Sequence, residues 1–126
     1  MLEDKAILVV DDDYTLLQLY EERIKQEGAI VSTAQDGAEA VQKAAETRPH
    51  IILLDLMMPA MNGFEVLEKL KEDESTRNIP VIVFTALADE NKRKTAMELG
   101  ADDYLVKSEV LPIDVVEKIK TVISGR

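Results

Sequence analysis

Short apolar runs alternate along the chain with longer segments in which apolar side chains recur every three or four residues. The apolar runs predict strands over residues 5–10, 29–34, 51–54, 81–84 and 102–106. The longer segments predict helices over residues 15–27, 38–46, 63–70, 90–99 and 112–123. Strands and helices that alternate in this way are joined by right-handed crossovers. The sequence therefore predicts an α/β fold, in which one five-stranded parallel sheet is covered by five helices on both faces in a doubly wound arrangement.

Two of the predicted helices have inner faces with few or small apolar side chains. In the fourth helix only Ala96, Met97 and Leu99 are apolar on the inner face, so we expect this helix to be the least firmly held. The polar run 71–78 is expected to be a solvated connection. The second helix is expected to pack closely through small inward side chains, which are Ala38, Val41, Ala44 and Ala45.

The composition limits the classes of function. Lys and Arg number 15 against 25 Asp and Glu in 126 residues, which gives a net charge of −10 at pH 7. Such a chain repels phosphate backbones, so direct binding of nucleic acid is not expected. The length predicts one compact domain over residues 1–126. With no Cys, no apolar stretch long enough for a membrane span and no signal-peptide pattern, we expect a cytoplasmic protein without a disulfide or thiol site.

Polar side chains stand where four of the predicted strands end. They are Asp11 and Asp12 after the first strand, Asp55 after the third, Thr85 after the fourth and Lys107 after the fifth. The carboxyl ends of parallel strands meet at one edge of a sheet, and ligands bind there in open α/β folds. We therefore expect these five side chains to converge.

Three converging carboxylates need compensation. At about 4 Å each pair would repel by roughly 4 kcal/mol at an effective dielectric constant of 20, so either one carboxylate keeps its proton or a cation lies among them. Oxygen ligands without His or Cys favour Mg²⁺ or Mn²⁺. A carboxylate can also attack phosphorus to form an aspartyl phosphate, and the metal and Lys107 would offset the charge of the transferred group. The hydroxyl of Thr85 could bind one of its oxygens.

Each of these residues also has a simpler interpretation. Asp12 and Asp13 are residue types frequent in turns and helix caps. Thr85 is an ordinary strand residue, and Lys107 alone would be a solvated cation. Asp55 is different, because a carboxylate with apolar residues on both sides is costly unless it is paired or used. The occurrence of complementary polar groups at four strand ends favours a functional site.

Four segments, LVVDDD, LLDLMMPAMNG, VIVFTA and GADDYLVK, resemble those of response-regulator receiver domains, the CheY-like family. The resemblance extends over nearly the whole chain and implies a flavodoxin-like fold. It also implies a switch in a two-component or phosphorelay system, and not an enzyme that turns over an external substrate. The phosphodonor would be a phosphohistidine on a sensor histidine kinase or on a histidine phosphotransfer protein.

The resemblance assigns the phosphoacceptor and the metal ligands. Asp55 would accept the phosphoryl group. The Mg²⁺ ion would be held by Asp11, Asp12, Asp55 and the backbone carbonyl of Met57.

The resemblance also assigns a switch. Thr85, Ala86 and Lys107 would contact the phosphoryl group, and Tyr104 would change rotamer as Thr85 moves. That movement would bias the loop 85–89 and the fourth helix. A downstream protein would bind the last two helices and the fifth strand, and the chain would be a monomer or a weak dimer linked to phosphorylation.

Two positions depart from the family pattern. Ser108 follows Lys107 where most members have Pro in a cis linkage, and a cis bond before Ser would cost about 3–4 kcal/mol. We therefore expect either a trans linkage with a changed loop or retained strain. Tyr14 stands where Pro is frequent, close to the expected kinase-docking surface.

Two other features are expected to lie outside the site. His50, the single histidine, precedes Asp55 by five residues, which places it roughly 16 Å away at the opposite end of the third strand. The phosphohistidine must therefore belong to another molecule. The cationic run 92–94 is expected to be a solvated helix face.

Two rival functions remain from the residues alone. A phosphatase of the haloacid-dehalogenase type would use Asp11 and Asp13, with Thr15, in a DxDxT motif. That assignment leaves Asp55 without a role, and the Lys that should precede the last acidic pair follows it. The third candidate is a receiver-like module that binds a partner without phosphorylation, and it would need an incomplete site.

Overall fold

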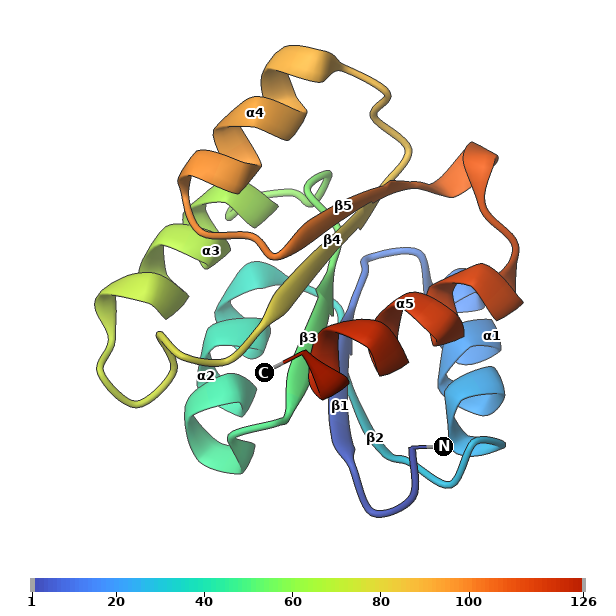
Figure 1. Cartoon of the computed structure of the whole chain (residues 1–126). Helices are drawn as coiled ribbons and strands as arrows, with labels where there is room; N and C mark the ends of the chain where they lie inside the picture. The colour runs from blue at the N-terminus through green and yellow to red at the C-terminus, as the bar shows by residue number, and fades with distance from the viewer. Residues whose placement is uncertain (1, 126) are drawn as a thin grey trace.

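Within residues 2–125, which the computed structural model describes, five strands form one sheet in the order β2-β1-β3-β4-β5 (Figure 1). Every pairing is parallel. All residues of β3 and β4 are buried, which is why the two strands appear in the sequence as unbroken apolar runs. The predicted α/β fold is confirmed. The strands are β1 (Ala6–Val10), β2 (Ile30–Ala34), β3 (Ile51–Leu54), β4 (Val81–Thr85) and β5 (Asp103–Val106).

Five α-helices in the described part of the chain cover the two faces of the sheet. They are α1 (Tyr14–Lys25), α2 (Gly37–Thr47), α3 (Gly63–Glu72), α4 (Glu90–Glu98) and α5 (Pro112–Ser124), and a short 3₁₀ helix η1 (Lys107–Glu109) precedes α5. Helices α1 and α5 lie against one face, and α2, α3 and α4 lie against the other (Figure 1). None of the described helices is long and apolar enough to cross a membrane.

Alternate residues of the strands supply two separate cores. In β1, Leu8 and Val10 pack with α2 and α3, whereas Ile7 and Val9 pack with α1 and α5. The central strands are therefore covered on both faces, whereas the outer strands β2 and β5 are only partly buried.

Side-chain caps set the starts of four helices. In each of these helices a capping side chain accepts a hydrogen bond from a free backbone N–H of the first turn. The caps of α1, α2, α3 and α4 are Asp13, Asp36, Asn62 and Asp89, respectively. Asp13, Asp36 and Asp89 follow the ends of β1, β2 and β4 within four residues, so these three loops are short, whereas a longer loop separates β3 from Asn62.

The prediction for the inner face of α2 was partly wrong. Ala38 and Ala45 are exposed, whereas Gly37, Ala40 and Ala44 are buried. The buried residues are three and four positions apart and form one stripe, which α2 presses against β1 and β2. The exposed alanines lie one position beside that stripe.

Helix α4 has the thin apolar face that was predicted, since Ala96 is its buried residue and Met97 is 38% exposed. The prediction that 71–78 is a solvated connection was wrong at Thr76. This side chain is 2% exposed and its hydroxyl donates to the backbone carbonyl of Leu70 at 2.7 Å. The bond anchors the segment to the end of α3.

Glu27→Gln is expected to lower the melting temperature slightly at neutral pH. The Glu27 carboxylate accepts from Lys120 Nζ at 2.9 Å and from Arg23 Nη1 at 3.0 Å, and so joins α5 to the end of α1. The Lys120 hydrogen bond, followed by that of Arg23, holds the pKa of Glu27 below its ordinary value. The stabilisation is therefore complete above the ordinary pKa of Glu and is lost as the pH falls through the lower pKa of the folded state.

Thermal unfolding of wild type and Glu27→Gln from neutral to acid pH checks this prediction. The exposed Glu22 on α1 supplies the matched control Glu22→Gln. The two unfolding temperatures of wild type and Glu27→Gln should converge at acid pH, and a gap that does not change with pH would contradict the prediction.

Candidate functional site

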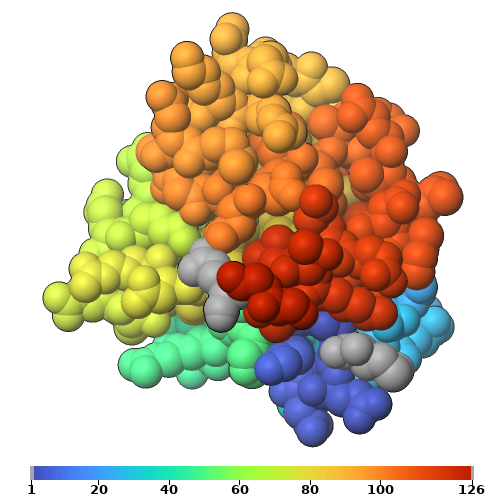
Figure 2. All heavy atoms as spheres, viewed as in Figure 1, coloured from blue at the N-terminus to red at the C-terminus, as the bar shows by residue number. Residues whose placement is uncertain are grey.

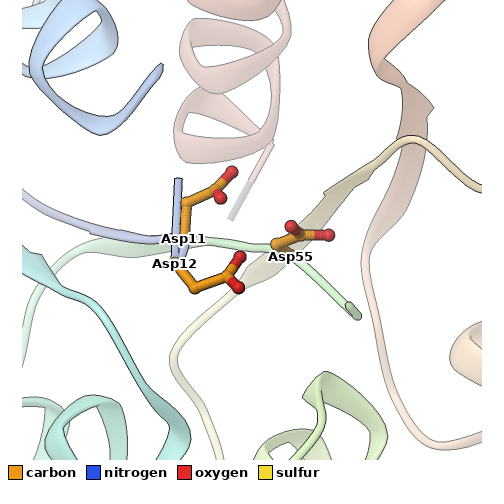
Figure 3. Close-up of side chains that lie close together, drawn as sticks. All are labelled: Asp11, Asp12 and Asp55. Carbon is orange, nitrogen blue, oxygen red and sulfur yellow. The ribbon is translucent and has the colours of Figure 1, made fainter. Parts of the chain in front are cut away.

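Asp11, Asp12 and Asp55 lie together at the carboxyl edge of the sheet, at the ends of β1 and β3 (Figure 3). The strand order places β2 on one side of β1 and β3 on the other, so the three residues stand at the switch point of the fold. The Asp11 N–H donates to Ala34 O at 3.1 Å, and the Asp55 N–H donates to Val10 O at 3.0 Å. These bonds continue the sheet ladder and position both aspartates.

The carboxylates are close and two of them are buried. One oxygen of each lies within 4.8 Å of the others. Asp11 is 3% exposed and Asp55 is 4% exposed, whereas Asp12 is exposed. The cluster is therefore closed on the side of the sheet and accessible at Asp12.

Lys107 brings a positive charge into the cluster. Its Nζ lies 2.7 Å from Asp11 Oδ2 and 3.2 Å from Asp55 Oδ2. The ammonium also lies 5.8 Å from the centroid of the Phe84 ring, within the range of a cation–π interaction. Lys107 follows β5, so its side chain reaches across β4 to the ends of β3 and β1.

The site is electrostatically unbalanced. Burial raises the pKa of Asp11 above its ordinary value, and the Lys107 hydrogen bond opposes this only in part. Burial by itself lowers the pKa of Lys107, but the Asp11 hydrogen bond and the charge of Asp55 outweigh it and raise the pKa. Lys107 is therefore an ammonium at neutral pH. One ammonium among three carboxylates leaves an excess of negative charge.

The donor set fits a hard divalent cation. The clustered ligand atoms of Asp11, Asp12 and Asp55 are all carboxylate oxygens, which suit Mg²⁺ or Mn²⁺ better than metals that prefer imidazole or thiolate. A cation held by these residues would offset the excess negative charge.

Asp55 is held in a fixed orientation. Its Oδ1 accepts from the Met57 N–H at 3.1 Å and its Oδ2 accepts from Lys107 Nζ at 3.2 Å. Charge-assisted bonds of this kind restrict the carboxylate to one rotamer. Its oxygens therefore have a defined direction relative to the neighbouring carboxylates.

Thr85 and Tyr104 are linked through Leu87. Thr85 ends β4, is fully buried, and its Oγ1 accepts from the Leu87 N–H at 3.4 Å. The Tyr104 hydroxyl donates to Leu87 O at 2.7 Å, and the side chain is 4% exposed. The buried Tyr104 hydroxyl is thus hydrogen-bonded to the loop that follows Thr85. Ala86, which lies between Thr85 and Leu87, is exposed.

Residues 7–120 match the protein family described as the response regulator receiver domain. The chain belongs to this family. It is a receiver domain of two-component signalling, and the matched segment contains the acidic cluster and Lys107.

Curated relatives agree with this assignment. Response regulator PleD of Caulobacter vibrioides (strain NA1000 / CB15N) is 49% identical over 108 residues, which cover 86% of this chain and 23% of PleD. Transcriptional regulatory protein PrrA of Mycobacterium leprae (strain TN) is 42% identical over 120 residues, which cover 95% of this chain and 50% of PrrA. The chain spans half or less of the length of these two relatives.

Solved structures confirm the predicted receiver fold. A response regulator receiver domain protein (CheY-like) from Methanospirillum hungatei JF-1 matches with a TM-score of 0.90 and 31% identity, over 98% of this chain and 96% of that chain. The BeF3-activated DrrB receiver domain matches with a TM-score of 0.84 and 30% identity, over 98% and 99% of the two chains.

The receiver does not assemble the arrangement that the dehalogenase-like rival needs. Asp13 caps α1, and its Oδ1 accepts from the Leu16 N–H at 3.2 Å. Among the described residues the acidic cluster consists of Asp11, Asp12 and Asp55, without Asp13. For Asp13 the interpretation as a helix cap is therefore correct.

Of the two forms expected for the loop after Lys107, a trans linkage or retained strain, the structure has the trans linkage. Every peptide bond between described residues is trans, including Lys107–Ser108. Lys107–Glu109 form the 3₁₀ helix η1. The receiver therefore brings Lys107 to the carboxylates without a cis bond.

Two residues that support the receiver site have no clear signal in the sequence. Phe84 appears only as one more apolar residue of β4, although its ring lies beside the Lys107 ammonium. Gly63 appears only as the start of α3, although its Cα packs against the backbone of Asp55 and Leu56. Both roles depend on contacts between strands and loops that are distant in the chain.

Proposed function

We propose that this receiver accepts a phosphoryl group on Asp55 from a phosphohistidine of a sensor histidine kinase or a histidine phosphotransfer protein. The observation that carries the proposal is the Asp55 carboxylate, which is buried and oriented by Met57 N–H and Lys107 beside two further acidic side chains. A downstream protein then recognises the altered surface of α4, β5 and α5. Residues 1–126 act as one receiver domain, as a monomer or as a weak dimer linked to phosphorylation.

In this proposal Asp11, Asp12, Asp55 and the backbone carbonyl of Met57 hold Mg²⁺, with Mn²⁺ as a substitute. The cation supplies charge neutralisation for the oxygens of the transferred group. The carboxylates bind it, and their excess negative charge, together with the raised pKa of Asp11, supports a cation at this position.

In the transfer step one carboxylate oxygen of Asp55 attacks phosphorus. A P–O bond to Asp55 forms as the P–N bond to the donor imidazole breaks, and the bonding electron pair leaves with the imidazole nitrogen. The Lys107 ammonium binds a phosphoryl oxygen, and its raised pKa keeps the proton on Nζ during the step. The Thr85 hydroxyl and the Ala86 N–H donate to the other oxygens.

Phosphorylation then changes the loop that follows β4. When Thr85 moves toward the phosphoryl group, the Leu87 backbone moves with it, and the Tyr104 hydroxyl that is bonded to Leu87 O follows. Water later hydrolyses the acyl phosphate, so the receiver is a reversible switch and not a turnover enzyme. Because α4 has a thin apolar face, we expect only a small free-energy difference between its arrangements before and after phosphorylation.

Incubation with acetyl phosphate and Mg²⁺ tests the proposal. One phosphoryl adduct per chain is expected by intact-mass spectrometry, and peptide mapping is expected to place it on Asp55. Addition of EDTA before the donor should prevent its formation. Turnover of assorted phosphate esters without a stable adduct would instead favour the dehalogenase-like phosphatase, and absence of both would favour a module that binds without phosphorylation.

Leu19→Lys is expected to slow transfer from a phosphohistidine donor on the order of tenfold. Leu19 is 47% exposed on α1, and Tyr14, Leu111 and Ile113 are also exposed near the start of α1 and α5. Both helices begin shortly after site residues, so these exposed apolar side chains lie near Asp55. We therefore propose that the donor docks on them. Uptake from acetyl phosphate should be unchanged, because this small molecule needs no docking surface.

The control for this prediction is Ile30→Lys. Ile30 is 62% exposed at the start of β2, at the sheet edge opposite to the carboxylates. Rapid-mixing measurements with a phosphorylated donor should show a slow rate for Leu19→Lys and an ordinary rate for Ile30→Lys. Equal rates for the two variants would remove α1 from the docking surface.

A further inference from the structure

One cation on the outer side of α4 lies against the buried ring of Tyr104. The Arg93 Cζ is 5.9 Å from the ring centroid, and Arg93 Nη1 donates to the Tyr104 backbone carbonyl at 3.3 Å. Figure 2 shows α4, in orange, as part of the surface at the top of the molecule. Arg93 thus links an exposed helix to the β5 residue that is proposed to change rotamer.

The contacts of Arg93 continue inward to the phosphorylation site. The Tyr104 hydroxyl donates to Leu87 O at 2.7 Å, and the Leu87 N–H donates to Thr85 Oγ1 at 3.4 Å. Thr85 is fully buried at the end of β4. A continuous set of contacts therefore runs from the surface of α4 to the hydroxyl that is proposed to bind the phosphoryl group.

We propose that Arg93 is a positioning residue for this site: by holding Tyr104 in its buried orientation, it keeps Leu87 and the Thr85 hydroxyl in the arrangement that receives a phosphoryl group. The effect on Thr85 rests on the proposed function, whereas the hold on Tyr104 does not. The cationic run 92–94 was predicted to be a solvated face, and Arg93 and Lys94 are exposed as predicted, whereas Lys92 is half-buried. Arg93 differs from Lys94 in that its guanidinium, although the residue is exposed, has two contacts with Tyr104.

The packing of α4 makes this contact important. Ala96 is the buried residue of α4, so few apolar contacts hold the helix against β5. A cation–π interaction at an exposed position changes an equilibrium by about two- to fivefold. That change is large enough to alter the balance between a buried and an exposed Tyr104 and too small to unfold the protein.

The first measurement concerns the orientation of Tyr104 in the unphosphorylated protein without metal. 3-Fluorotyrosine is incorporated, and the ¹⁹F resonance of Tyr104 is assigned by its loss in Tyr104→Phe. Arg93→Ala is expected to lower the ratio of buried to exposed Tyr104 by about two- to fivefold. Arg93→Lys should restore most of the ratio, because an ammonium retains the cation–π contact. Lys94→Ala, which removes a neighbouring charge of the same sign, should leave the resonance unchanged.

The second measurement is the maximal rate of phosphoryl uptake from acetyl phosphate with Mg²⁺. Arg93→Ala should lower it in proportion to the fraction of chains in which the ¹⁹F measurement finds Tyr104 buried, and so by at most about two- to fivefold, whereas Arg93→Lys should restore it and Lys94→Ala should match wild type. The melting temperatures of all three variants should stay near that of wild type, which separates positioning from unfolding.

The outcomes separate this inference from the proposed function. If wild type takes up no phosphoryl group, the proposed function fails, and the ¹⁹F ratio still tests the hold on Tyr104. If wild type is phosphorylated but Arg93→Ala leaves the ¹⁹F ratio unchanged, or lowers the buried fraction without lowering the rate, the role of Arg93 is overturned alone. An equal effect of Lys94→Ala would also overturn it, because general charge and not the contact with Tyr104 would be responsible.

Discussion

Asp55→Asn is expected to abolish uptake of a phosphoryl group from acetyl phosphate in the presence of Mg²⁺. The Asn amide cannot form the acyl phosphate that a carboxylate oxygen forms. Asn has nearly the shape of Asp, and its amide oxygen can still accept a hydrogen bond from Lys107 or from the Met57 N–H. The variant should therefore fold, and its melting temperature without metal should equal or exceed that of wild type, because one of three repelling carboxylates has been removed. Intact-mass spectrometry measures the loss of the adduct.

Two other aspartates distinguish the nucleophile from its neighbours. Asp11→Asn keeps the nucleophile but removes a metal ligand, so uptake at a fixed Mg²⁺ concentration should fall on the order of a hundredfold and should recover in part as Mg²⁺ is raised. Asp13→Asn is the matched control, since Asn can also cap α1 and uptake should equal that of wild type. If Asp55→Asn still took up phosphate while Asp11→Asn did not, the assignment of Asp55 as phosphoacceptor would be wrong.

The arrangement of the sheet follows from features that are local in the sequence. Periods of two and of three to four residues separate the strands from the helices, and right-handed crossovers leave few ways to connect them. The detailed burial of the helices does not follow in the same way. Ala38 and Ala40 are equally small, and only the angle at which α2 meets the sheet decides that Ala40 is buried and Ala38 exposed. Single-residue polarity contains no information on that angle.

The position of the candidate site, like the arrangement of the sheet, could be predicted from the sequence. The convergence of Asp11, Asp12 and Asp55 depends only on their positions at strand ends, and the structure brings them together. The fine contacts depend on tertiary distances. Nothing in the local sequence tells which carboxylates Lys107 pairs with, or that the exposed Arg93 on α4 contacts a ring on β5.

Gly63 connects the stability of the fold with the site. A Cβ placed on Gly63 would lie 2.4 Å from the Asp55 carbonyl oxygen and 2.6 Å from the Leu56 Cα. Both are backbone atoms, so no side chain can rotate away to make room. The Gly63 N–H donates to Leu56 O at 3.0 Å, which holds the start of α3 against the segment that leaves β3. Glycine is therefore required here by the close approach of two backbone segments.

Gly63→Ala is accordingly expected to destabilise the protein by about 3 kcal/mol, at the upper end of the usual cost of overpacking. The matched control is Gly125→Ala at the end of α5, where the nearest atom to the added Cβ is Thr121 O at 3.3 Å, and little change is expected. Urea unfolding should show a lower midpoint for Gly63→Ala alone. Since relief of the clash must displace the Asp55 backbone, the folded fraction of Gly63→Ala should also take up phosphate more slowly than wild type. A wild-type midpoint would show that α3 can shift without cost, and normal uptake by a destabilised variant would show that the strain does not reach Asp55.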